Sequence, residues 1–291
     1  MRAGGVPREY KSLGSNCELR ITNCALIMEI GISTASLFLR MYNEDAVVKL
    51  NELDARVAEV FLETFSEYTE RYGKKLNKRL GDVKVHSVHV VTTQYEPQLF
   101  GQNLRGYEDA MKMFEGVLKC AKAIGATNYT LHGRAYFKKR GPFEEYDHFA
   151  ARLNEMCDLA ETYGVSVCLE NVYWCMYNRP GFFTHLKDKC PKLRTCLDIK
   201  QARLSGYDAL EYVEEMAGRI NTVHLSDYDE KTDKMCLPGK GDYDFTRLFK
   251  ALKNVGFDGN MLIEVYKDDY RDYSEFTKAL EYLRQIKDKV F

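Results

Sequence analysis

The chain has 291 residues, 45% of them hydrophobic, and its 42 basic and 43 acidic residues leave a net charge of −1. This length supports one large core, since α/β barrels of about 250 residues form a single domain. The balanced charge argues against a dedicated nucleic-acid binder, which would carry a basic face for contacts with phosphates.

The cysteines and the apolar runs predict the compartment. The nine cysteines form no CxxC pair, and some lie in apolar runs such as Val167–Leu169. We interpret them as small buried residues in a reducing compartment. No apolar run approaches the ~20 residues of a membrane span, and Met1–Ser15 lacks the apolar segment of a signal peptide. We therefore expect a cytoplasmic protein that makes no membrane contact.

The predicted strands are short runs rich in aliphatic and β-branched residues. In chain order they cover Ala25–Ser33, Val57–Leu62, Val83–Val91, Tyr129–His132, Val165–Glu170, Leu193–Asp198, Ile220–Leu225 and Met261–Val265. Between them, apolar residues recur at helical spacing, and several of these segments end at a glycine. The predicted helices cover Met111–Ile124, Phe149–Tyr163, Phe183–Lys187, Tyr207–Ala217, Phe245–Val255 and Tyr273–Ile286.

Strands that alternate with helices indicate a parallel sheet, because parallel strands need crossover connections. Eight repeats of the unit favour closure into a single (β/α)8 barrel, a TIM barrel of the α/β class, over residues 25–291. An open doubly wound sheet is the alternative, but no GxGxxG motif follows the first strand. Residues 1–24 fit no barrel element and are predicted to be an N-terminal extension.

Four later strands each end on a side chain that can bind a metal ion: Glu170, Asp198, His224 and Glu264. In a barrel the C-terminal ends of the strands meet at one mouth, so these side chains are expected to converge. Carboxylates beside the core are costly unless they are paired or bound to a cation. The sequence therefore predicts a site for one divalent metal ion at this mouth.

Two earlier strands also end in a metal-competent residue, namely His89 and His132. Each could be a ligand of a second metal, a substrate contact or a buried core imidazole, and the sequence alone leaves these three roles open. His86 lies three residues before His89. By strand alternation it belongs to the opposite face, so we expect it to pack beneath a helix.

The ordered motifs along residues 25–290 resemble the xylose-isomerase-like TIM barrels, a superfamily of sugar and sugar-phosphate isomerases and epimerases that also includes apurinic endonucleases of the endonuclease IV type. The motifs that carry the resemblance are Gly31–Ser33, Leu169–Asn171, Leu197–Asp198, Val223–Asp227, Gly239–Gly241 with Asp244–Phe245, and Ile263–Glu264.

The resemblance implies a metal-dependent isomerase or epimerase that acts on a sugar or sugar phosphate through an enediolate. The four strand-end residues would hold one Mn, Mg, Co or Zn ion, and Glu170 and Glu264 would also transfer protons. Arg134 and Lys240 could bind a phosphate or carboxylate of the substrate. The candidate substrate contacts are Asn171, Trp174, Gln201, Arg134, Lys240, His89 and His132.

Two other enzyme classes remain open. An endonuclease of the related type would use additional zinc ions, but Gln201 and Met235 stand where two histidine ligands of that branch are expected. A thioether is a poor zinc ligand beside oxygen donors. A lyase, a dehydratase or a C-glycoside-cleaving enzyme would follow the same proton abstraction with an elimination. We expect a small sugar as partner and no nucleic acid, and the sequence does not decide whether the chain forms a homo-oligomer.

Overall fold

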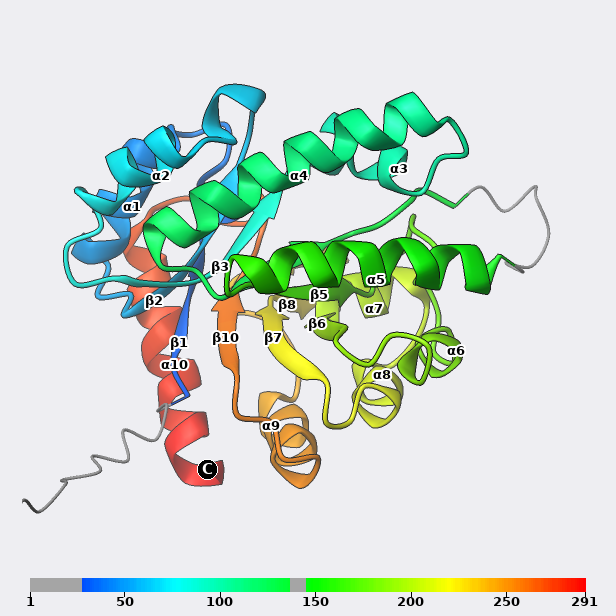
Figure 1. Ribbon diagram of the computed structural model, residues 1–291. Coiled ribbons are helices and arrows are strands. Elements are labelled where there is room, and N and C mark those ends of the chain that lie inside the picture. Colours follow the sequence, from blue (N-terminus) through cyan, green and yellow to red (C-terminus); the bar gives the residue numbers. More distant parts are fainter. Residues whose placement is uncertain (1–27, 137–144) are drawn as a thin grey trace, which may run out of the picture.

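The computed structural model describes residues 28–136 and 145–291, and its central feature is a closed barrel of parallel strands (Figure 1). The strands follow one another around the barrel in the order β1–β10–β7–β6–β5–β4–β3–β2. They are β1 Ile30–Ser33, β2 Val57–Leu62, β3 Lys84–Val90, β4 Asn128–Leu131, β5 Ser166–Glu170, β6 Arg194–Asp198, β7 Ile220–Leu225 and β10 Asn260–Ile263. Closure confirms the predicted TIM barrel and rules out the open sheet.

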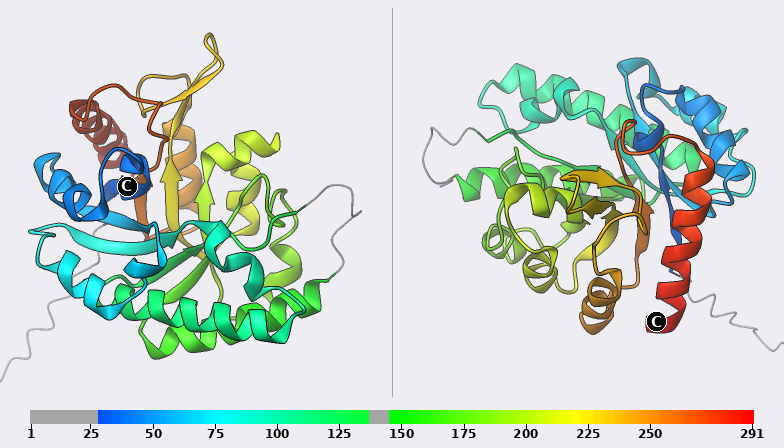
Figure 2. Two further views of the ribbon diagram at one scale, coloured as in Figure 1. Left: turned by 90° about the horizontal axis from the view of Figure 1, so that it is seen from above. Right: turned by 180° about the vertical axis from the view of Figure 1, so that it is seen from behind.

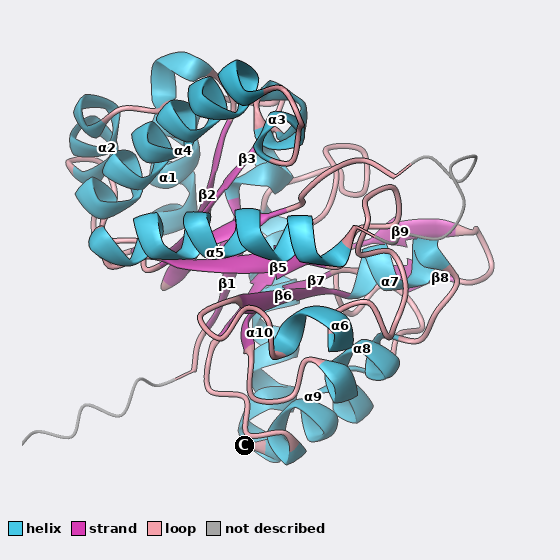
Figure 3. Cartoon of the chain, turned by 45° about the vertical axis from the view of Figure 1, so that its right-hand side comes forward, coloured by secondary structure: helices cyan, strands magenta, loops and turns pink. Residues whose placement is uncertain are grey.

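Helices surround the strands and cover their outer faces (Figure 3). They are α1 Asn43–Glu52, α2 Glu70–Asn77, α3 Glu96–Leu99, α4 Leu104–Ile124, α5 Tyr146–Thr162, α6 Thr184–Lys187, α7 Ile199–Ser205, α8 Ala209–Glu215, α9 Phe245–Asn254 and α10 Ser274–Val290. The short 3-10 turns Thr34–Leu37, Phe65–Glu67 and Thr92–Gln94 follow β1, β2 and β3. The sequence analysis predicted all eight strands of the barrel, but it did not predict α1, α2, α3 or α7.

A small antiparallel hairpin lies outside the barrel, after β7. It consists of β8 Asp227–Asp229 and β9 Lys234–Cys236, and it projects from the barrel in the view from above (Figure 2, left). One buried carboxylate holds its base, because Asp227 accepts hydrogen bonds from the backbone N–H groups of Gly239, Gly241 and Tyr243 at 2.9–3.0 Å.

Local sequence explains how the elements begin, end and pack. The long helix α4 begins at Asn103, whose side chain accepts a hydrogen bond from Gly106 N, and ends at Gly125 in the left-handed conformation. Strands β1 and β2 approach so closely at Gly31 that an added Cβ would lie 1.8 Å from Val57 O. The glycine of the predicted Gly31–Ser33 motif is therefore needed for strand contact.

The prediction for His86 was wrong, because its side chain lies inside the barrel. Its Nε2 is 2.9 Å from Thr222 Oγ1, and its Nδ1 is 3.0 Å from Asn260 Nδ2. Both partners come from strands on the far side of the barrel. The register between β2 and β3 shifts at Ala58/Glu59, so the extra residue breaks the alternation on which the prediction rested.

The other sequence predictions meet different outcomes. The proposed N-terminal extension lies outside the described residues. The described cysteines are free, and all but Cys236 are buried. In the described part of the chain, no helix is long and apolar enough to cross a membrane.

Candidate metal centre

The four strand-end residues of the sequence analysis converge at one mouth of the barrel. Glu170 and Asp198 are the last residues of β5 and β6, His224 is the fifth residue of β7, and Glu264 directly follows β10. One ligand-competent atom of each lies within 4.8 Å of the others. His224 is central, since its Nδ1 is 3.2 Å from Glu170 Oε1, 3.3 Å from Glu264 Oε2 and 3.7 Å from Asp198 Oδ2.

Unpartnered oxygens in this cluster fit a bound cation. Glu170, Asp198 and Glu264 are almost fully buried, and each has one buried carboxylate oxygen without a hydrogen-bond partner among the described residues. Buried polar atoms are usually hydrogen-bonded, so three orphaned acceptors at one point need an explanation. A divalent cation would satisfy all three, and oxygen with imidazole nitrogen suits ions such as Mn²⁺, Co²⁺ or Zn²⁺.

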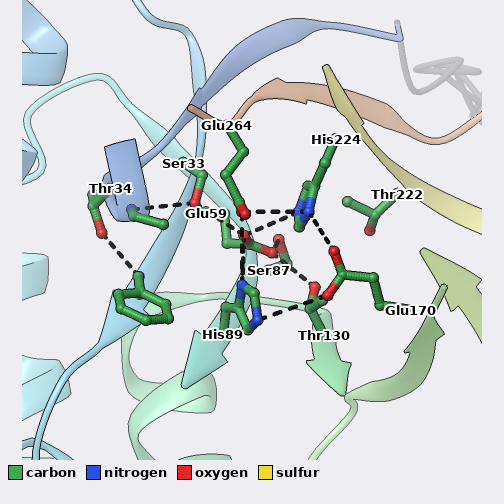
Figure 4. A network of polar contacts seen from close by, with 12 residues as sticks. Ser33, Thr34, Glu59, Ser87, His89, Thr130, Glu170, Thr222, His224 and Glu264 are labelled. Carbon is green, nitrogen blue, oxygen red and sulfur yellow. Dashed lines mark hydrogen bonds and ion pairs between the residues drawn. The ribbon is translucent and has the colours of Figure 1, made fainter. Parts of the chain in front are cut away.

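A buried carboxylate that the sequence analysis missed lies beneath the cluster (Figure 4). Glu59, in the middle of β2, is fully buried. Its carboxylate accepts hydrogen bonds from Ser33 Oγ at 3.0 Å and from Ser87 Oγ and Thr130 Oγ1 at 2.7 Å. Its Oε1 lies 3.1 Å from His224 Nε2. An acidic residue inside the apolar run VAEVFL was the available signal, because a buried carboxylate needs partners.

Two groups of four side chains at this mouth could hold a metal ion, and the hydrogen bonds of Glu59 indicate which of them fits better. The set Glu59, His89, His224 and Glu264 also converges, but three hydroxyl groups already occupy the carboxylate of Glu59. The set with Glu170 and Asp198 has the free oxygens. In it, the Nδ1 of His224 faces the ligands and the Nε2 faces Glu59, which is the arrangement by which carboxylates orient metal-binding histidines.

The two further histidines, whose roles the sequence left open, line the same mouth. His89 Nε2 is 3.0 Å from His132 Nε2, and His132 Nε2 is 3.4 Å from Glu170 Oε2. His132 Nδ1 lies 3.5 Å from Oε2 of the buried Glu96 on α3. His89, His132 and Glu170 thus form another group whose atoms could hold an ion.

Burial and charge shift the pKa values in the cluster in opposite directions. Burial raises the pKa of Glu170, and the nearby His132 and His224 only partly offset this effect. For Glu264 burial also acts upward, but His224 and Lys200 hold the pKa of this carboxyl below its usual range. Burial lowers the pKa of His89, yet the carboxylates of Glu264 and Glu59 raise it to about 10.

Two predicted substrate contacts brace the backbone around the cluster. Asn171 Nδ2 donates to Asp198 O, and Asp198 N donates to Asn171 Oδ1, both at 2.8 Å. This pair of bonds joins the ends of β5 and β6 and accounts for the burial of the amide. The Oε1 of Gln201 accepts from Tyr173 N at 3.3 Å and so holds the loop after β5.

Of the other predicted substrate contacts, one lies beside the mouth of the barrel and two form ion pairs elsewhere. The ring of Trp174 lies 5.8 Å from that of His132, so it borders the mouth. Arg134 pairs with Glu145 at 2.9 Å, and Lys240 pairs with Glu275 on α10. Within the described residues, neither cation forms a hydrogen bond or ion pair with the four predicted ligands.

The structure also brings Lys200 to the cluster, which the sequence analysis did not anticipate. Its side chain is 1% exposed, and its Nζ is 3.6 Å from Glu264 Oε1 and 3.9 Å from Asp198 Oδ2. A lysine in the first turn of a helix is usually solvent-exposed, and no local signal marks this one as buried.

A closed parallel barrel with buried carboxylates and histidines at the C-terminal ends of its strands defines the class of this protein: a TIM barrel with an enzyme-like centre. Residues 47–286 match the family model described as xylose isomerase-like TIM barrel. The chain therefore belongs to this family, which confirms the resemblance drawn from the motifs.

Several known proteins are similar to this chain. Fructoselysine 3-epimerase of Escherichia coli O157:H7 is 24% identical over 203 residues, which are 66% of this chain and 71% of that protein. A D-tagatose 3-epimerase-like protein has a TM-score of 0.73 at 21% identity, over 91% of this chain and all of that one. The IOLI protein, solved with a zinc atom bound, has a TM-score of 0.67 at 17% identity, over 91% of this chain and 99% of that one.

Proposed function

We propose that this protein is a metal-dependent isomerase or epimerase that acts on a sugar or sugar phosphate through an enediolate. The convergence of Glu170, Asp198, His224 and Glu264, with their unpartnered carboxylate oxygens, carries this proposal. Family membership and the similarity to fructoselysine 3-epimerase support a sugar as substrate. The zinc atom bound in the similar IOLI structure supports a divalent ion as the cofactor.

The four residues would hold one divalent ion, and Glu59 would keep the His224 ring in place from below. When bound, such an ion polarises a carbonyl group and thereby makes the neighbouring C–H bond more acidic. The protein itself then has to orient the sugar and move the proton.

Glu170 and Glu264 are the proposed proton-transfer pair. They come from β5 and β10, which β6 and β7 separate in the barrel, so they face the mouth from different sides. Removal of the proton by one carboxylate, and delivery of a different proton to the opposite face by the other carboxyl group in its protonated form, would invert the carbon, as an epimerase requires. Trp174 and His132 border the mouth and could provide an apolar wall and a hydrogen bond to the sugar.

Solvent exchange tests this assignment. Incubation of the Mn²⁺-loaded protein in heavy water with a panel of ketoses, including D-tagatose, D-psicose and fructoselysine, should place deuterium on the carbon beside the carbonyl. Glu264→Gln and Glu170→Gln should each abolish formation of the deuterated epimer while the thermal unfolding stays cooperative, because an amide keeps the shape and loses the proton-transfer group. Glu161→Gln, at an exposed ion pair with Lys192, is the matched control and should exchange normally.

Other products would change the conclusion in defined ways. Product without solvent deuterium would show a hydride shift and leave both glutamates as ligands only. Loss of water or of an aglycone from the substrate would point to the lyase class instead.

A hydrolase with two metal ions is the second candidate, because His89, His132 and Glu170 form a second possible ligand group. Counting bound ions by equilibrium dialysis and mass spectrometry separates the two functions. We expect one ion per chain, unchanged in His132→Gln. Two ions together with cleavage of an abasic duplex would favour the hydrolase.

A further inference from the structure

A buried lysine that the proposed chemistry does not yet use lies beside the metal cluster. Lys200 is the second residue of α7, two positions after the helix cap Asp198. It is one of the largest fully buried side chains of the barrel. A buried ammonium group is costly unless charges compensate it, and a position at the start of a helix adds repulsion from the helix dipole.

The neighbours of this lysine balance its positive charge, but they do not accept hydrogen bonds from its N–H groups. The carboxylate oxygens of Glu264 and Asp198 lie 3.6 and 3.9 Å from Nζ, beyond the range of a hydrogen bond. The ring of Tyr266 covers the ammonium at 4.2 Å. Among the described residues, Nζ has no hydrogen-bond partner, although an ammonium carries three donors.

The net charge of the ligands gives a reason for a buried lysine beside this metal site. The three carboxylates of the cluster carry three negative charges, so a divalent ion leaves one negative charge. The ammonium of Lys200 would offset the charge that remains on these three ligands. Without it, an oxygen that becomes anionic during the reaction would enter a site that is already negative.

We propose that Lys200 is a specificity-determining residue that weakens binding of the metal cation and binds an anionic oxygen of the substrate through its free N–H groups. This inference rests on the proposed function and deepens it. In this role Lys200 favours substrates that present a negatively charged oxygen to the metal cluster. An α-hydroxycarbonyl compound does so when it loses a proton.

The proposal predicts effects of opposite sign, which a purely structural role would not produce. Lys200→Met removes the charge and keeps the length of the side chain. It should bind Mn²⁺ at least about tenfold more tightly in a calorimetric titration of the metal-free protein, because a cation about 4 Å from the ligand oxygens no longer repels the ion. The Mn²⁺-loaded variant should bind acetohydroxamate, an anionic chelator with two oxygen donors, at least about tenfold more weakly.

The controls separate charge from packing. Lys200→Gln, whose amide tolerates a polar setting, should shift both affinities in the same directions and serves if the methionine variant does not fold. Lys187→Met changes a lysine whose Nζ donates to Ala217 O at the other end of the barrel, and it should leave both affinities unchanged.

The outcomes also separate this inference from the proposed function. A wild-type protein that binds no Mn²⁺ contradicts the proposed function. A wild type that binds Mn²⁺, together with folded Lys200 variants whose Mn²⁺ affinity is unchanged or lower, overturns the role of Lys200 alone. Unchanged affinity for acetohydroxamate would likewise overturn it.

Discussion

His86 makes the stability of the barrel depend on pH in a way that one substitution can isolate. Asn260 Nδ2 donates to its Nδ1, so the ring hydrogen is on Nε2, which faces Asn221 O and Thr222 Oγ1. If His86 bound a second proton at Nδ1, that N–H would face the side-chain N–H of Asn260, and no acceptor would be available to it. Burial inside the barrel likewise disfavours the imidazolium and lowers the pKa of His86 from 6.5 to about 4.

The sign and size follow from proton linkage. Between pH 6.5 and 4 the unfolded chain binds a proton at this position and the folded protein does not, so acid favours unfolding. A folded pKa of about 4 against 6.5 corresponds to a loss of about 2 kcal/mol in the free energy of unfolding between pH 7 and pH 5. This is a large part of the roughly 5–15 kcal/mol that stabilises a typical protein.

Urea unfolding of the metal-free protein, in EDTA, measures this loss. The wild type should be more stable than His86→Gln at pH 7, and its advantage should shrink by about 2 kcal/mol at pH 5 because glutamine does not titrate. His148→Gln, at an exposed position of α5, should track the wild type at every pH. A difference between wild type and His86→Gln that stays constant from pH 7 to pH 5 would refute the reasoning.

Two further predictions concern the supports of the metal cluster. Glu59→Gln should bind Mn²⁺ about 10- to 100-fold more weakly, because His224 loses the carboxylate that orients its ring; an unchanged affinity in a calorimetric titration would contradict this role. Asn171→Ala removes both bonds to the backbone of Asp198, and the two groups left unpaired should lower the free energy of unfolding by about 2–4 kcal/mol in urea. If stability is retained and only sugar binding is lost, Asn171 is a substrate contact, as the sequence first suggested.

The sequence by itself determined the strands, their alternation with helices and the polar residues at the strand ends. These are local features, because aliphatic runs and helical periodicity can be read without knowledge of the fold. Closure of such repeats into a barrel then required Glu170, Asp198, His224 and Glu264 to share one mouth, whatever their separation in the chain.

The tertiary structure alone decided which other side chains face the barrel interior. A register shift between two neighbouring strands turned His86 inward, and an alternating pattern cannot reveal such a shift. Glu59 became the floor of the cluster only because hydroxyl groups from three other strands surround it. Lys200 is buried because the ends of β6 and β10 place carboxylates around its ammonium group. Contacts of this kind depend on how distant strands meet in the closed barrel, which no local stretch of sequence specifies.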